Sequence, residues 1–167
     1  QLFNLNILNF IILPLIFFFI VYINKKSKNI YRKRPYKKNF FLFGFLFGFG
    51  FYLSGISWIT NSLTFDNNFR VLIPFALILI PLILSLFMAF TIFIIGPFLK
   101  YNLQSLFIFS GSLAFSDYLR SKVLTGFPWN MWAYSTNWMV EFIQISNTIG
   151  LNAYNLIVIT LFTSPII

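Results

Sequence analysis

The sequence predicts an all-α fold, a polytopic transmembrane helical bundle with about five spans. Of the 167 residues, 59% are hydrophobic and 9% are charged, against roughly 45–50% and about 25% in soluble domains. Five long stretches contain almost no ionisable side chain, and eight of the 12 Lys and Arg residues lie between Lys25 and Lys38. A water-soluble domain is excluded, because such a chain has too few polar side chains to cover its surface.

The five apolar stretches are the predicted spans, at residues 2–23, 40–63, 71–99, 101–119 and 142–167. A helix needs about 20 residues, at about 1.5 Å rise per residue, to cross a hydrocarbon core of ~30 Å. The third stretch is longer than this, so we expect it to tilt or to kink at Pro74 and Pro81.

The positions of the positive charges predict the orientation of the chain. With five spans, the basic loop 24–39 and the loop around Lys100 share one side of the membrane and hold nine Lys and Arg residues, against three on the other side. Positive loops remain in the cytoplasm. The loop 24–39 is therefore predicted to be cytoplasmic, and the loop 120–141 is predicted to face outward.

The composition also excludes several kinds of chemistry. The chain has no cysteine and no histidine, so disulfides, thiolate metal sites, Cys nucleophiles and His acid–base catalysis are absent from it. With three carboxylates in all, a catalytic carboxylate pair is not expected. No metal and no cofactor is predicted. Nucleic-acid binding is not predicted either, because the basic cluster occupies one juxtamembrane loop and no nucleic-acid recognition motif accompanies it.

Small residues follow one face of the second span. Gly44, Gly48, Gly55 and Ser62 are spaced by four, seven and seven residues, which keeps them within about 40° of one another on a helix. Such a row lets a second helix approach closely. A nucleotide-binding glycine loop is the alternative, but no Lys-Ser/Thr pair follows these glycines.

The loop 120–141 is crowded with aromatic side chains, namely Phe127, Trp129, Trp132, Tyr134 and Trp138. Gly126 permits a turn, and Pro128 prevents regular helix. Asp117 and Arg120, three residues apart at the end of the fourth span, can form an ion pair, which alone is usually solvated. An aromatic belt at the membrane interface is one interpretation of this loop.

The order of the residues in this loop points to a second interpretation. The string Leu124-Thr125-Gly126-Phe127-Pro128-Trp129-Asn130, preceded by Asp117-Tyr118-Leu119-Arg120 and followed by Tyr134-Ser135, resembles the membrane domain of bacterial apolipoprotein N-acyltransferases. The stretch from Gly48 to Ile59, with Ser57-Trp58 near its end, is similar to the glycine-rich third helix of that family. Asp117 stands where the family more often has Glu, and Ala133 stands where it has Gly.

The resemblance implies a bacterial inner-membrane enzyme in which membrane helices precede a nitrilase-like periplasmic domain. It implies transfer of an acyl chain from a phospholipid to the N-terminal diacylglyceryl-cysteine of an apolipoprotein, through the Cys of a Glu-Lys-Cys triad. No cysteine is present here, so the chain is interpreted as a membrane-domain fragment without catalytic residues, inactive alone. The apolar run that ends at Ile167 agrees with this interpretation.

By the same resemblance, the fragment's share of the reaction is to bind lipid and to hold the catalytic domain at the membrane. The predicted lipid-binding residues lie in the outward loop and at the end of the second span; they are Phe127, Trp129, Arg120, Pro128, Gly126 and Trp58. The alternatives are a membrane transporter or channel subunit and a structural membrane protein. No ionisable residue lies near the middle of a predicted span, which argues against a transporter.

Overall fold

The computed structural model describes residues 5–30, 36–65, 67–123, 128–136 and 140–166. Every regular element in these ranges is a helix, and the described residues contain no strand. The predicted all-α class is therefore confirmed.

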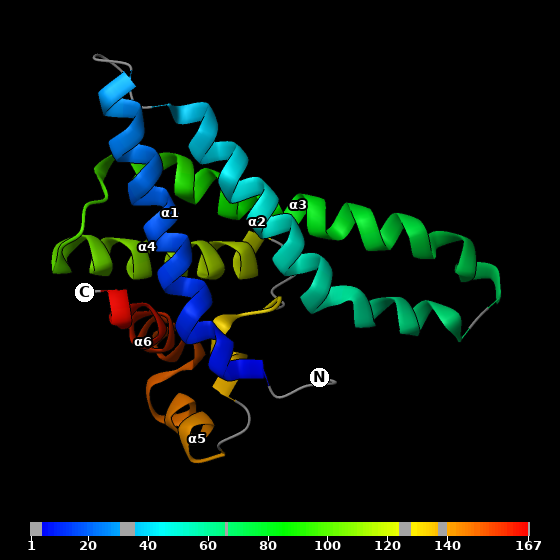
Figure 1. Cartoon of the computed structure of the whole chain (residues 1–167). Helices are drawn as coiled ribbons and strands as arrows, with labels where there is room; N and C mark the ends of the chain where they lie inside the picture. Colours follow the sequence, from blue (N-terminus) through cyan, green and yellow to red (C-terminus); the bar gives the residue numbers. More distant parts are fainter. Residues whose placement is uncertain (1–4, 31–35, 66, 124–127, 137–139, 167) are drawn as a thin grey trace.

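Six α-helices form the framework (Figure 1). They are α1 (Asn9–Ile30), α2 (Lys37–Ile56), α3 (Ile73–Ile95), α4 (Leu103–Val123), α5 (Val140–Ile149) and α6 (Leu151–Thr163). Short 3₁₀ helices extend or connect them, at η1 (Leu5–Leu8), η2 (Ser57–Thr64), η3 (Asn67–Leu72), η4 (Gly96–Phe98), η5 (Trp132–Thr136) and η6 (Ser164–Ile166).

Three helical runs are long and apolar enough to cross a membrane, Asn9–Ser27, Lys37–Asn61 and Asn67–Phe98. A shorter apolar run covers Leu151–Ile166. Helix α4 has 21 residues, enough to cross at about 1.5 Å per residue, but Asp117, Arg120 and Lys122 make it more polar than the others. About five spans is compatible with this set of helices.

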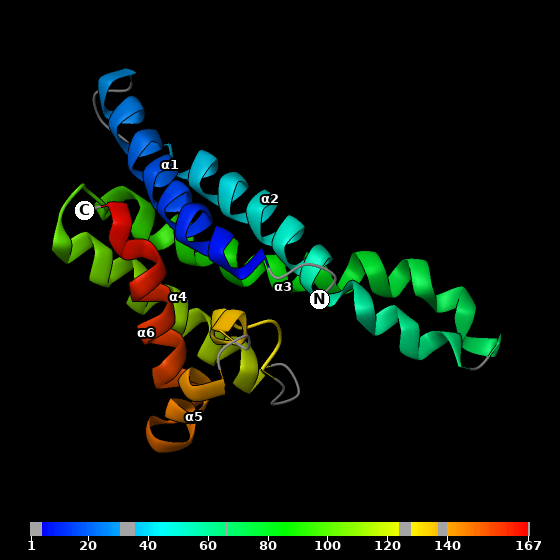
Figure 2. The same ribbon diagram turned by 60° about the horizontal axis from the view of Figure 1, so that its bottom comes forward.

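Helices α2 and α3 form a long antiparallel hairpin, whose tip stands clear of the other helices in two views (Figures 1 and 2). The predicted close approach along the glycine face of α2 is present. A Cβ atom on Gly44 would lie 2.9 Å from the Cα atom of Ala89 on α3, and one on Gly48 would lie 3.0 Å from the Cβ atom of Met88. Only residues without a side chain allow the two backbones to approach this closely.

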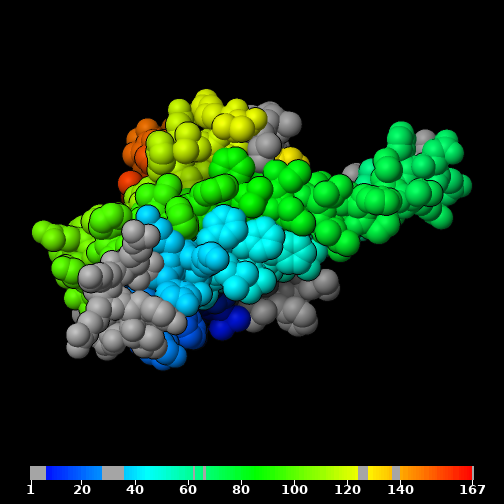
Figure 3. Space-filling view, turned by 90° about the horizontal axis from the view of Figure 1, so that it is seen from above, coloured from blue at the N-terminus to red at the C-terminus, as the bar shows by residue number. Residues whose placement is uncertain are grey.

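On one face of the molecule α3 lies between α2 and α4 (Figure 3). The main core lies where α1, α3, α4 and α6 meet, and its fully buried side chains include Phe17, Ile20, Ile92, Phe109 and Ile159. Lipid tails are as apolar as these side chains, so close packing, rather than removal from water, stabilises a bundle of this kind.

The first part of the basic loop 24–39 is helical, which differs from the prediction of a loop beginning at residue 24. Helix α1 continues to Ile30, and Asn24 is buried. Its Nδ2 atom donates hydrogen bonds to the carbonyl oxygens of Pro97, at 3.0 Å, and Leu99, at 2.9 Å. These bonds satisfy backbone groups in the turn between α3 and α4, and they fix the end of α1 against that turn.

The predicted fifth span, 142–167, consists of two helices. Gly150 has a φ angle of 85°, a left-handed conformation that other residues seldom adopt, and it separates α5 from α6. Helix α5 has 10 residues, about 15 Å at 1.5 Å per residue, which is too short to cross a ~30 Å core. The apolar run of the sequence therefore does not correspond to one straight helix.

Helix α5 is amphipathic. Phe142, Ile145 and Ile149 lie within about 60° of one another on its surface, whereas Gln144 and Asn147 lie on the opposite face. Phe142 and Ile145 also line a cavity of about 200 Å³ that α5 covers together with α6. This pattern is typical of a helix that lies along a membrane interface.

Candidate functional site

The aromatic loop that follows α4 folds back onto the helices. Pro128, Trp129 and Asn130 are half-buried, and Asn130 has a φ angle of 42°, a left-handed turn conformation that asparagine tolerates better than most residues. Two predicted site residues, Gly126 and Phe127, lie outside the described residues.

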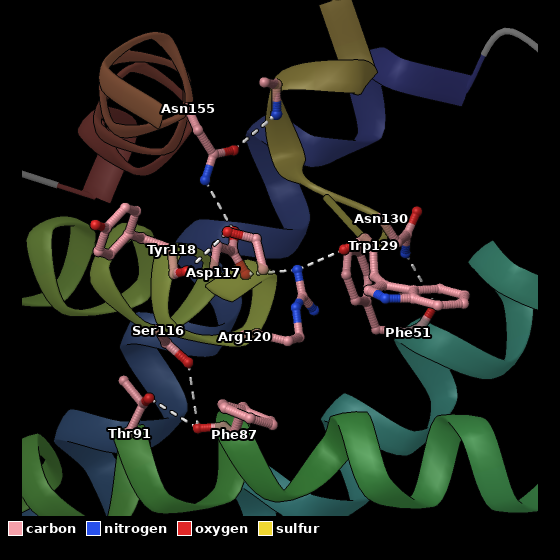
Figure 4. A network of polar contacts seen from close by, with 12 residues as sticks. Phe51, Phe87, Thr91, Ser116, Asp117, Tyr118, Arg120, Trp129, Asn130 and Asn155 are labelled. Atoms are coloured by element: carbon pink, nitrogen blue, oxygen red, sulfur yellow. Dashed lines mark hydrogen bonds and ion pairs between the residues drawn. The ribbon is translucent and has the colours of Figure 1, made fainter. Parts of the chain in front are cut away.

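Beneath this loop, Asp117 and Arg120 of α4 form a buried ion pair (Figure 4). Their side chains lie 2.9 Å apart, and the residues are 5% and 1% exposed. The prediction of a solvated pair at an exposed helix end is therefore wrong. The loop that follows α4 and the more distant helix α6 cover this end of α4.

Arg120 connects three parts of the structure. Its Nη2 atom donates one hydrogen bond to Asp117 and a second, short one to the backbone carbonyl of Trp129. The guanidinium carbon lies 4.7 Å from the centroid of the Tyr52 ring on α2, a cation–π contact that partly replaces the lost hydration of the charge. Its Nε and Nη1 atoms are buried and have no hydrogen-bond partner among the described residues.

Asn155 of α6 completes the network from the other side. Its Nδ2 atom donates to Asp117 Oδ2 at 2.8 Å, and its Oδ1 atom accepts from the backbone N–H of Ala133 at 2.9 Å. Asn155 is fully buried. One amide side chain thus links the carboxylate of α4 to the loop, so the loop is held by hydrogen bonds at both Trp129 and Ala133.

Aromatic packing supports the same placement of the loop. Trp132 stacks on Phe51 of α2, with ring centroids 4.4 Å apart and an interplanar angle of 19°. Trp129 packs against a cluster formed by Tyr52, Ile56 and Leu84.

Gly55 of α2 provides the space for the loop. The Asn130 side chain occupies the position that a Cβ atom on Gly55 would take, and its Nδ2 atom lies 3.5 Å from the carbonyl oxygen of Phe51. One predicted packing glycine therefore serves the contact between helix and loop, and Gly44 and Gly48 serve the contact between helices.

The structure brings Trp129, Pro128 and Arg120 together, but it leaves Trp58 apart. Trp58 lies on η2, is 60% exposed, and does not belong to the cluster around Tyr52. Sequence reasoning missed Tyr52 and Asn155. A signal for Asn155 was present, because a polar amide in an otherwise apolar helix usually forms a hydrogen bond to a neighbouring helix.

The loop and its polar network can bind and orient a ligand. The described residues of this site include no activated nucleophile. The described residues include no group of three His, Cys, Asp or Glu side chains that could hold a metal ion. Tyr134, in the loop beyond the spanning helices, has a pKa that burial raises above its ordinary value, so its phenol remains protonated at neutral pH. The site therefore offers aromatic surface and neutral polar groups to a ligand.

Comparison with known proteins gives one family. Residues 1–163 match the family described as "Apolipoprotein N-acyltransferase N-terminal domain". Proteins named apolipoprotein N-acyltransferase are 36% identical over 122 residues in Rickettsia bellii, covering 72% of this chain and 24% of that protein, and 34% identical over 149 residues in Rickettsia typhi, covering 89% and 28%. The relative from Brucella melitensis is 32% identical over 123 residues, covering 73% and 23%.

The chain thus spans about a quarter of the length of these relatives. No solved structure matches the chain.

Proposed function

Since the chain belongs to the apolipoprotein N-acyltransferase family, whose N-terminal domain it matches over residues 1–163, we propose that it forms the membrane part of an enzyme that acylates apolipoproteins. In this proposal a phospholipid donates the acyl chain, and the N-terminal diacylglyceryl-cysteine of the apolipoprotein accepts it. The chain has no cysteine, so the nucleophile comes from outside it. Its own share is to bind lipid beside the catalytic domain.

The observation that supports a role in lipid binding is the hydrogen-bond network that fixes the aromatic loop. Arg120 and Asn155 bind backbone groups of the loop, and a buried carboxylate binds both side chains. Such a network fixes a loop whose regular structure, among the described residues, is limited to the five-residue 3₁₀ helix η5. A fixed aromatic surface can guide flexible acyl chains without losing its own conformational entropy on binding.

Trp129 and Pro128 form the described part of the proposed lipid-contacting surface, and Gly126 and Phe127 belong to the same proposal. Arg120 is assigned an indirect role. Its guanidinium is 1% exposed and bound to Asp117, so in this conformation it does not present its charge to a lipid phosphate. We therefore propose Arg120 as a positioning residue that holds Trp129, and Trp58 as a contact for lipid outside the network.

Acyl transfer is tested with protein expressed from the complete reading frame that contains this chain. The purified protein receives a phospholipid and a diacylated lipopeptide, and mass spectrometry follows the lipopeptide. We expect the lipopeptide to gain the mass of one acyl chain on its N-terminal amine, and no gain when the phospholipid is omitted. An unchanged lipopeptide, together with solute flux through vesicles that contain the protein, would reject the enzyme and favour a transporter.

For orientation, we propose that the loop 24–39 faces the cytoplasm and that the loop 120–141 faces the periplasm of a bacterial inner membrane. Lys26→Cys and Lys122→Cys form a matched pair for this test, because both lysines are exposed and each lies over a tyrosine of the preceding turn, at 5.8 and 5.7 Å. In intact spheroplasts a membrane-impermeant thiol reagent should label only Lys122→Cys. Labelling of Lys26→Cys alone would reverse the orientation.

A further inference from the structure

A long apolar groove lies between α3 and α4, on a part of these helices that the loop network does not use. Its volume is about 630 Å³, within the range of about 300–1,000 Å³ for small-molecule sites. The groove is lined by Ile83, Phe87 and Ile95 of α3 and by Gly111, Phe115 and Leu119 of α4. From Ile83 to Ile95 it follows 13 residues of α3, or about 18 Å for the 12 steps of 1.5 Å between them.

Small residues keep this groove open. A Cβ atom placed on Gly111 would have no heavy atom within 4 Å, so the absent side chain leaves space and does not serve a close helix contact. This differs from Gly44 and Gly48, where the partner helix occupies the space. The open space at Gly111 is part of the groove itself.

Two of the three hydroxyl side chains that line the groove, Thr91 and Ser116, are turned toward the backbone. Thr91 Oγ1 donates to the carbonyl oxygen of Phe87 at 2.8 Å, and Ser116 Oγ lies 3.4 Å from the same oxygen. These bonds satisfy the hydroxyls of Thr91 and Ser116 within the protein, so the wall is mostly hydrocarbon, with Ser112 as a further polar residue in it. An apolar ligand fits this surface, whereas a polar ligand would find few groups to bind.

One end of the groove carries a positive charge. Lys122 is seven residues beyond Phe115 and three beyond Leu119, so at 100° per residue it lies within about 20° of Phe115 on the surface of α4. Lys122 is exposed. The apolar wall thus continues, one turn further along the helix, into an exposed ammonium group.

From this arrangement we propose that the groove between α3 and α4 binds one acyl chain of a phospholipid, with the phosphate of the headgroup at Lys122. The length of about 18 Å approximates one leaflet, which is half of the ~30 Å core. Lysine is a common phosphate ligand. This inference rests on the proposed function, since it makes the groove the site where the acyl donor binds before the transfer. The proposed orientation places Lys122 on the periplasmic side.

The experiment uses protein from the complete reading frame in vesicles of phosphatidylethanolamine and phosphatidylglycerol. A small fraction of the phosphatidylglycerol carries a diazirine in one acyl chain, and mass spectrometry maps the sites labelled after irradiation. We expect stronger labelling of the groove residues than of Phe18 and Tyr22 on α1, both of which are exposed.

Two pairs of variants test the two ends of the site. Gly111→Leu fills the groove and should lower its labelling to the level on α1; Gly50→Leu is the control, because a Cβ atom there also has no heavy atom within 4 Å and Gly50 lies on α2. Lys122→Gln should lower the labelling about fivefold, the effect of one lysine near anionic headgroups. Lys26→Gln, its matched control, should leave the labelling unchanged.

Equal labelling of the groove and of α1 would overturn the inference, because the lipid would then show no preference. A groove without label, covered by another helix of the protein, would overturn it as well. Neither outcome affects the proposed acyl transfer, which is measured on the lipopeptide. Conversely, a protein with a strongly labelled groove and no acylation of the lipopeptide would contradict the proposed function and leave the lipid site in place.

Discussion

Asp117→Leu is expected to lower the free energy of unfolding by about 3–5 kcal/mol, because it leaves the buried guanidinium of Arg120 without its counter-ion. Arg120 is 1% exposed, so water cannot replace the lost carboxylate without opening the structure. Arg120→Leu is expected to cost a similar amount, because it leaves the carboxylate buried with Asn155 as its remaining described partner. Unfolding of purified protein in a denaturing detergent, followed by circular dichroism, measures both changes.

The double variant Asp117→Leu/Arg120→Leu separates the burial of an unpaired charge from the loss of packing. We expect it to be more stable than either single variant, since no unpaired charge remains. Glu141→Leu is the control for a carboxylate; Glu141 is exposed on α5, and its loss should change stability by at most about 0.5 kcal/mol. Equal, small effects of all four variants would show that the pair is solvated.

Trp129→Ala is expected to slow acyl transfer by roughly 5- to 150-fold in the complete enzyme, the factor that corresponds to a lost aromatic contact of ~1–3 kcal/mol. The backbone carbonyl of Trp129, which Arg120 binds, remains in this variant. The loop therefore keeps its hydrogen bonds, and the membrane level of the protein should stay near normal. The measurement is N-acylation of a diacylated lipopeptide per mole of purified enzyme, with a melting curve for each variant.

Trp58→Ala distinguishes lipid guidance from an aromatic belt. Trp58 is 60% exposed and outside the cluster around Tyr52, so it represents an exposed tryptophan that does not belong to the loop. If Trp129 only positions the protein at the interface, both variants should lower the amount of folded protein and preserve the activity of each molecule. Full specific activity of Trp129→Ala would leave the loop a structural role alone.

The fold class could be predicted from the sequence because mean hydropathy is an average over many residues. A single polar or apolar residue that is out of place changes this average very little. A close helix contact along α2 was also accessible, because a row of glycines has a local period that a helix converts into one face. Its partner, α3, is known only from the structure. By contrast, the break at Gly150 depends on a single φ angle. The mean hydropathy of residues 142–167 does not reveal this break, although a glycine after a helix commonly marks the end of that helix.

The polar network could not be predicted because its members are distant in sequence. Asp117 and Arg120 are three residues apart and suggest a pair, but their burial depends on Asn155, 38 residues beyond Asp117, and on Tyr52 of another helix. The spacing of a pair does not reveal what covers it. The lipid-binding roles of Phe127 and Gly126 remain predictions, since both residues lie outside the described residues.

The separation of 38 residues between Asp117 and Asn155 also affects the order of events during synthesis of the chain. A ribosome adds about 5–20 residues per second, so α4 emerges about 2–8 s before the amide that completes the coordination of its carboxylate. During that interval the charge of Asp117 has only Arg120, from the same helix, to neutralise it. Because α4 itself carries the counter-ion of Asp117, this pair can enter the membrane as a neutral unit, and the later arrival of α6 then adds the hydrogen bond from Asn155.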